Sequence, residues 1–142
     1  MEQVVLDASI IAKLFLKEEG SDTAIKLKDR HVRGEIEITA PSLLKYELIN
    51  LLKNAHFSRD EICDALKAIR DYGFSVIELS DELFDSAAEL SVNHSITSYD
   101  AAYVALAKDI DTLLYTADRK LLLKVKDLKF VKHLAEAGAC AS

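Results

Sequence analysis

Apolar residues recur along this chain with two periods, and together these periods predict strands that alternate with helices. Short runs rich in β-branched residues have the length and composition of buried strands. They cover residues 3–6, 35–39, 74–79, 112–115 and 129–131. Between them, apolar residues spaced three or four positions apart predict helices. These helices are expected at residues 9–18, 21–33, 41–56, 58–73, 81–92, 99–108 and 118–124.

Several residues mark where the expected helices begin and end. Pro41 suits the first turn of a helix, and Ser58 with Glu61 three residues later has the pattern of a capping box. Gly34 and Gly73 follow helical runs, where glycine commonly ends a helix. Strands that alternate with helices imply a parallel sheet with helices on both faces, which is an α/β fold. The 142 residues contain no linker or repeat and are expected to form one domain, residues 1–142.

The overall charge argues against a protein that holds nucleic acid by bulk electrostatic attraction. The formal net charge is −6 at pH 7 and the sequence pI is about 5.2, whereas such proteins usually carry a basic surface. A function on RNA would therefore need a local source of positive charge.

The compartment is indicated by the cysteines and by the hydropathy of the chain. Cys63 and Cys140 are too few for a disulfide framework. Cys63 stands among Ile62, Leu66 and Ile69 and is expected to be a core residue. No apolar run is long enough to span a membrane, and the first residues lack the basic region and cleavage site of a signal peptide. We expect a cytoplasmic protein.

Three acidic residues stand where an ordinary surface charge is not expected. Asp7 and Asp118 come just after expected strands, and Asp100 lies in the first turn of an expected helix. Because the carboxyl ends of parallel strands share one edge, where helix N-termini also gather, these carboxylates are expected to lie together. Each also has a structural alternative, since Asp is a favoured N-cap and a helix dipole stabilises an acid in its first turn.

Glu47 is the fourth unusual acid, because it lies in the apolar stripe of its helix. A carboxylate there is costly unless it is paired or binds a metal. Six residues beyond Pro41, it would lie roughly 9 Å along the helix and could still face the edge of the sheet. The alternative is a buried salt bridge, for example to Arg119.

Carboxylates gathered in one place repel one another, and a divalent cation relieves that repulsion. Mg²⁺ and Mn²⁺ prefer such hard oxygen ligands. Ser9 and Thr116 each stand two residues from one of the acids, where their hydroxyls could hold carboxylate oxygens or metal-bound water, or could simply be turn residues. Zinc is not indicated, because the four histidines show no ligand spacing with cysteine. The acids are therefore expected to bind Mg²⁺ or Mn²⁺.

Taken together, these residues resemble the PIN-domain family, and in particular the VapC toxins of prokaryotic toxin–antitoxin pairs. The resemblance covers nearly the whole chain and rests on the segments VVLDASII, KYELINLL, SYDAAYVALA and LLYTADRKLL. It implies a three-layer α/β/α sandwich with a central, mainly parallel sheet of four to five strands. The positions that match the family's acids and hydroxyls are Asp7, Glu47, Asp100 and Asp118, with Ser9 and Thr116.

The resemblance also implies an activity and partners. The expected activity is that of a Mg²⁺- or Mn²⁺-dependent endoribonuclease that hydrolyses RNA phosphodiester bonds. The expected partners are a second copy of the chain in a homodimer and a small VapB-like antitoxin that covers the site. Bound ions would supply the positive charge that the composition lacks. Among nearby basic residues, Arg119 is expected to contact phosphate, because it adjoins Asp118.

Three other functions fit part of the pattern. A catalytically silent PIN module would bind RNA or protein without cutting, although such a module has no reason to keep four mutually repelling acids. An aspartyl phosphatase of the haloacid dehalogenase type would carry a second acid two residues after the first, where this chain has Ser9. A receiver domain would carry adjacent acids before its first loop and a lysine after a late strand, an arrangement that LYTADRK does not supply.

Overall fold

A computed structural model describes residues 2–138, whose strands and helices follow the order that the sequence predicts. The strands are β1 (Glu2–Leu6), β2 (Ile36–Pro41), β3 (Ser75–Ile77), β4 (Leu113–Thr116) and β5 (Val131–His133). The helices are α1 (Ala8–Ala12), α2 (Ser21–Val32), α3 (Leu44–Asn54), α4 (Arg59–Tyr72), α5 (Asp81–His94), α6 (Ser98–Asp109) and α7 (Arg119–Lys124). A short 3₁₀ helix, η1 (Leu134–Ala137), follows β5.

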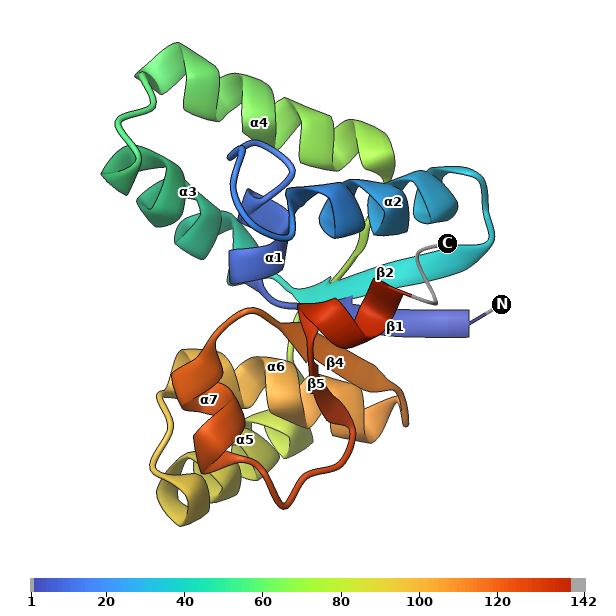
Figure 1. Cartoon of the computed structure of the whole chain (residues 1–142). Helices are drawn as coiled ribbons and strands as arrows, with labels where there is room; N and C mark the ends of the chain where they lie inside the picture. Colours follow the sequence, from blue (N-terminus) through green and yellow to red (C-terminus); the bar gives the residue numbers. More distant parts are fainter. Residues whose placement is uncertain (1, 139–142) are drawn as a thin grey trace.

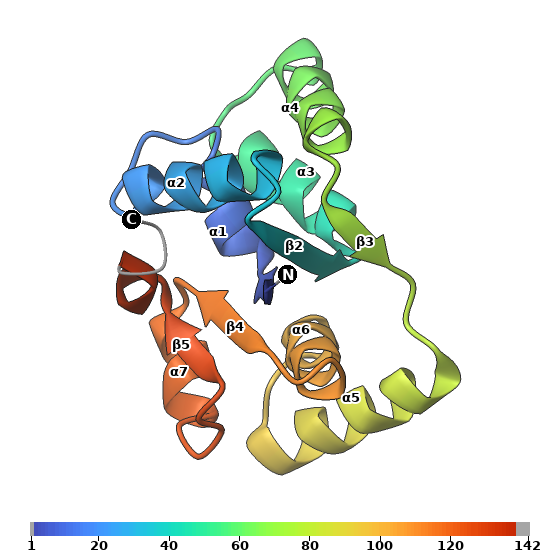
Figure 2. The same cartoon turned by 90° about the vertical axis from the view of Figure 1, so that its right-hand side faces the viewer.

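The sheet has five strands in the order β3-β2-β1-β4-β5, and every neighbouring pair is parallel. Helices α1 to α4 lie on one side of it and α5 and α6 on the other, while α7 lies beside β5 (Figures 1 and 2). The expected α/β/α sandwich with a parallel sheet of four to five strands is therefore confirmed.

The central strand β1 lies where the order of the strands reverses. Its neighbours are β2, which follows it in the chain, and β4, which comes much later. Connections that leave a strand in opposite directions open a crevice at its carboxyl end, and ligands of α/β proteins bind in such crevices. The residue at this point is Asp7, whose backbone N–H donates to the carbonyl of Tyr115 at the end of β4.

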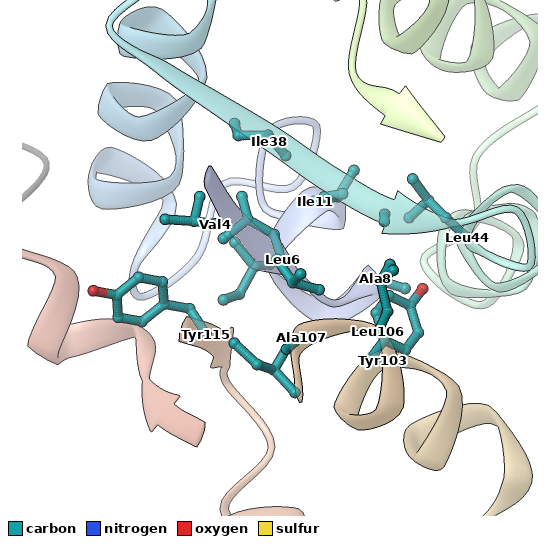
Figure 3. Close-up of a cluster of buried hydrophobic side chains, with 14 of the residues drawn as sticks. Val4, Leu6, Ala8, Ile11, Ile38, Leu44, Tyr103, Leu106, Ala107 and Tyr115 are labelled. Atoms are coloured by element: carbon teal, nitrogen blue, oxygen red, sulfur yellow. The ribbon is translucent and has the colours of Figure 1, made fainter. Parts of the chain in front are cut away.

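Residues from both layers of helices pack against the sheet. Val4 and Leu6 of β1, Ile11 of α1 and Leu106 of α6 belong to one buried cluster (Figure 3). All of residues 101–107 are buried, as expected from this small and apolar stretch. Helix α6 therefore runs through the interior, and its N-terminus opens at the carboxyl edge of the sheet.

The expected start of the third helix is wrong. Pro41 is the last residue of β2 and pairs with Ile77 of β3, and α3 begins only at Leu44. The φ angle that the proline ring imposes suits an extended strand as well as a first helical turn, so the residue alone did not distinguish them. As a result, Glu47 lies in the first turn of α3, nearer to the carboxyl edge than the sequence indicated.

The expected burial of Cys63 is also wrong, because this side chain is exposed. Helix α4 buries Ala65 and Ile69, and Cys63, two positions before Ala65, lies about 200° around the helix from it. Cys140 lies outside the described residues. Within residues 2–138, no helix combines the length and the apolar character that a membrane-spanning segment needs.

Candidate active site

Asp7, Glu47, Asp100 and Asp118 all line one cleft of about 520 Å³ at the carboxyl edge of the sheet. Its volume lies in the range of small-ligand sites. Besides the four acids, its walls include Ser9 and three tyrosines, but no Lys, Arg or His from residues 2–138. The fold therefore gathers four carboxylates in a cleft that contains no cationic side chain among those described.

Asp7 is held rigidly between β1 and α1. It caps α1 by accepting a hydrogen bond from the backbone N–H of Ile10 at 3.3 Å, and the same oxygen accepts one from Ser9 Oγ. Only 7% of the residue is exposed. Burial raises the pKa of Asp7 from 3.8 to about 6; hydrogen bonds from Ser9, Thr116 and Ile10 oppose this, and the charge of Asp100 adds to it. The residue is thus both a helix cap and a carboxylate that is costly to ionise.

Glu47 enters the same cleft from α3. Tyr103 Oη donates a hydrogen bond to Glu47 Oε1 at 2.8 Å. Burial raises the pKa of Glu47 from 4.5 to about 7; the Tyr103 hydrogen bond lowers it, and the charges of Asp7 and Asp100 raise it further. The sequence had also allowed a buried salt bridge between Glu47 and Arg119. This salt bridge is not formed, because the two side chains line different pockets.

Asp100 and Asp118 occupy the starts of α6 and α7. The backbone N–H of Asp100 donates to Thr97 Oγ1, the cap of α6, at 3.1 Å. Asp118 caps α7 by accepting two backbone hydrogen bonds at Oδ1, at 2.9 and 3.1 Å. Burial raises the pKa of Asp100 and the nearby charge of Asp118 adds to this, while the Thr97 hydrogen bond and the charge of Lys124 lower it. The two carboxylates therefore interact across the cleft.

The hydroxyls of Ser9 and Thr116 connect the ends of β1 and β4. Thr116 is fully buried, hydrogen-bonds to Asp7, and accepts a hydrogen bond from the backbone N–H of Asp118 at 3.0 Å. Ser9 Oγ donates to Asp7 and accepts from the backbone N–H of Ala117 at 3.3 Å. Both hydroxyls thus hold the Asp7 carboxylate, which was one of the three roles left open for them.

The donors in the cleft suit a hard divalent cation. They are carboxylate and hydroxyl oxygens, and Asp7 is a buried acid for which the cleft provides no cationic partner among the described residues. As placed, no three His, Cys, Asp or Glu side chains within residues 2–138 stand close enough to enclose an ion. Mg²⁺ keeps several of its waters and needs only one or two direct carboxylates. The oxygen donors of the cleft would therefore suit a divalent ion that keeps part of its hydration shell.

Sequence reasoning identified the four acids that line the cleft but missed Tyr103. Tyr103 was hidden in a run of buried apolar residues; its place three positions after Asp100, on the same face of the helix, was the available signal. Arg119 lies with Lys13, Thr23 and His133 around a second pocket, next to the acidic cleft but not part of it. Any contact it makes with phosphate must therefore be beside the acids.

Comparisons with known proteins agree with this geometry. Residues 4–128 match the family described as PIN domain. The protein Ribonuclease VapC3 of Pyrobaculum aerophilum is 36% identical over 128 residues, which is 86% of this chain and 94% of that protein.

Solved structures show the same fold. PAE2754 from Pyrobaculum aerophilum is 25% identical and superposes with a TM-score of 0.68, covering 99% of this chain and 96% of its own. A chain of a toxin–antitoxin complex from Klebsiella pneumoniae is 15% identical with a TM-score of 0.67, covering 90% and 94% of the two chains. At that identity the second likeness concerns the fold alone.

Proposed function

Since the chain belongs to the PIN-domain family, as a member of its VapC type, we propose that it is a metal-dependent endoribonuclease and the toxin of a toxin–antitoxin pair. The observation that carries the proposal is the convergence of four acids from four separate elements in one cleft. Burial and the charges of neighbouring acids raise the pKa values of Asp7, Glu47 and Asp100, and a bound divalent ion would offset that cost of ionisation.

Asp7 and Asp100 are the proposed principal metal ligands, with Glu47 and Asp118 joining them directly or through water. When bound, Mg²⁺ or Mn²⁺ would supply the charge that polarises the phosphodiester and lowers the pKa of water. Ser9 and Thr116 hold Asp7 in position, and Tyr103 orients Glu47. Glu47, whose pKa is raised to about 7, is suited to accept the proton that the attacking water loses.

Purified protein is expected to cut unpaired RNA when Mg²⁺ or Mn²⁺ is present and to stop when EDTA is added. A substrate blocked at both ends separates endonucleolytic from exonucleolytic cleavage, because only an endonuclease can shorten it. Cleavage that continues in EDTA would overturn the metal mechanism. Binding of RNA without any cleavage would favour the silent module instead.

Arg119 is proposed to contact a phosphate next to the scissile one. The variant Arg119→Ala should raise KM about three- to tenfold and leave kcat within about twofold, since a lost phosphate contact weakens binding more than chemistry. The salt dependence of binding should also become shallower. Arg59→Ala on α4 is the matched control, because Arg59 is highly exposed and does not line either pocket. Equal KM values for the two variants would remove Arg119 from the site.

The proposed partners follow from the same family membership. A VapB-like antitoxin should inhibit cleavage when added in equimolar amount, and a homodimer should be detected by light scattering at working concentration. We place the protein in the cytoplasm.

A further inference from the structure

The acidic cleft is flanked by two exposed tyrosines that the proposed chemistry does not use. Tyr46 is 76% exposed and Tyr99 is 60% exposed, and both line the cleft. Among the described residues, one other large aromatic side chain is at least 60% exposed. It is Phe84 on α5, which does not line the cleft. Exposed aromatic rings are thus concentrated beside the acids.

The other tyrosines have structural partners. Tyr103 and Tyr115 are buried in the core, and Tyr72 packs against Phe74 with Lys28 over its ring. Tyr46 and Tyr99 belong to no such cluster, so the fold does not explain why a large apolar ring stands at either position.

Each of the two tyrosines directly precedes an acid on its helix, Tyr46 before Glu47 on α3 and Tyr99 before Asp100 on α6. Consecutive residues on a helix point about 100° apart. Because the acid points into the cleft, the side chain of the preceding tyrosine therefore lies at the rim of the cleft. Helices α3 and α6 lie on opposite sides of the sheet (Figure 1), so the two tyrosines reach the cleft from opposite layers of helices.

We infer that Tyr46 and Tyr99 are stacking platforms for the bases of unpaired RNA on either side of the phosphate that is cut. This inference rests on the proposed ribonuclease function and specifies its substrate. No Lys, Arg or His among the described residues lines the cleft itself, so its walls would have to hold the RNA partly by contacts other than ion pairs. Flat aromatic rings bind any base through its face, and they reach that face only when the base is not stacked within a duplex. The two rings would therefore add affinity for unpaired bases, whichever bases they are.

The test compares Tyr46→Ala and Tyr99→Ala with Tyr46→Phe and Tyr99→Phe, which keep the ring. Binding of a fluorescently labelled, unpaired RNA of twelve nucleotides is measured by anisotropy, with Ca²⁺ replacing Mn²⁺ to limit hydrolysis. Each alanine variant should bind about tenfold more weakly, and each phenylalanine variant within about twofold of wild type. A duplex of the same length should not distinguish the variants.

A second measurement locates the bases that stack. After the cleavage site has been mapped, nucleotides on either side are replaced singly by ribose without a base. If a base stacks on Tyr46 or Tyr99, removing both the base and the ring should cost no more than removing one of them. Additive losses would overturn the inference.

The outcomes separate this inference from the proposed function. Alanine variants that bind single strands as tightly as wild type, while the wild type cuts RNA, would overturn the stacking role alone. Weaker binding by these variants in a protein that never cuts would uphold the stacking role and overturn the nuclease. Unchanged RNA binding together with a loss of dimers in light scattering would assign the tyrosines to a protein interface and overturn the stacking role.

Discussion

Protein carrying Asp100→Asn is expected to cleave RNA at least about 10³-fold more slowly than wild type in either Mg²⁺ or Mn²⁺, a loss of about 4 kcal/mol of transition-state stabilisation. The substitution removes one negative charge from the cleft with almost no change in volume. Asp7→Asn should have an effect of similar size. Because Asn caps a helix about as well as Asp, α1 should still form, and the loss can be assigned to chemistry. Initial rates at saturating RNA measure the effect.

The matched control is Asp109→Asn, which makes the same chemical change at the far end of α6. Asp109 is exposed and does not line the acidic cleft, so its rate should stay within about twofold of wild type. Mn²⁺ binding, measured by calorimetry in the absence of RNA, should weaken in Asp7→Asn and Asp100→Asn and persist in the control. If both cleft variants cut RNA at the wild-type rate, the four acids are not the catalytic centre.

The order of the elements could be predicted from the sequence because local patterns determine it. Ser58 with Glu61 forms the expected capping box at α4, and Gly73 ends that helix with φ of 73°. Pro41 and Cys63 show where local pattern fails. The ring of Pro41 fits two backbone conformations, and the packing of β2 against β3 decides between them. The neighbours of Cys63 are apolar in sequence, but the face of α4 that is buried depends on where the helix docks.

The acids could be predicted because topology is enough to place them. Asp7 and Asp118 follow neighbouring parallel strands, β1 and β4, and their positions are fixed by the sheet. The bond from Tyr103 to Glu47 joins residues 56 positions apart, and the pocket that Arg119 lines, at the start of α7, depends on tertiary packing. Neither is a property of the local sequence, and both appeared only with the fold.

The metal-free protein is expected to lose stability as the pH rises from 5 to 8. Asp7 has its pKa raised from 3.8 to about 6 and Glu47 from 4.5 to about 7, mainly by burial. The folded state therefore binds protons more tightly than the unfolded state, so this stability is present at low pH and is lost as the pH rises through the folded-state pKa values. Allowing for the partial exposure of Glu47, the loss should be on the order of 2 kcal/mol, or about 6 °C in Tm. Thermal unfolding in EDTA measures it.

The same acids should respond in the opposite direction to a metal. Mn²⁺ binds their ionised forms, so at pH 8 it should raise Tm in proportion to the logarithm of its concentration. A double variant with Asp7→Asn and Glu47→Gln should lose most of both the pH slope and the Mn²⁺ effect, because it removes the raised carboxylates and two of the proposed ligands. Asp109→Asn should retain both. A Tm in EDTA that does not fall between pH 5 and 8, or a slope that survives in the double variant, would show that Asp7 and Glu47 are not destabilised by burial. The repulsion that a divalent ion is proposed to relieve would then be absent.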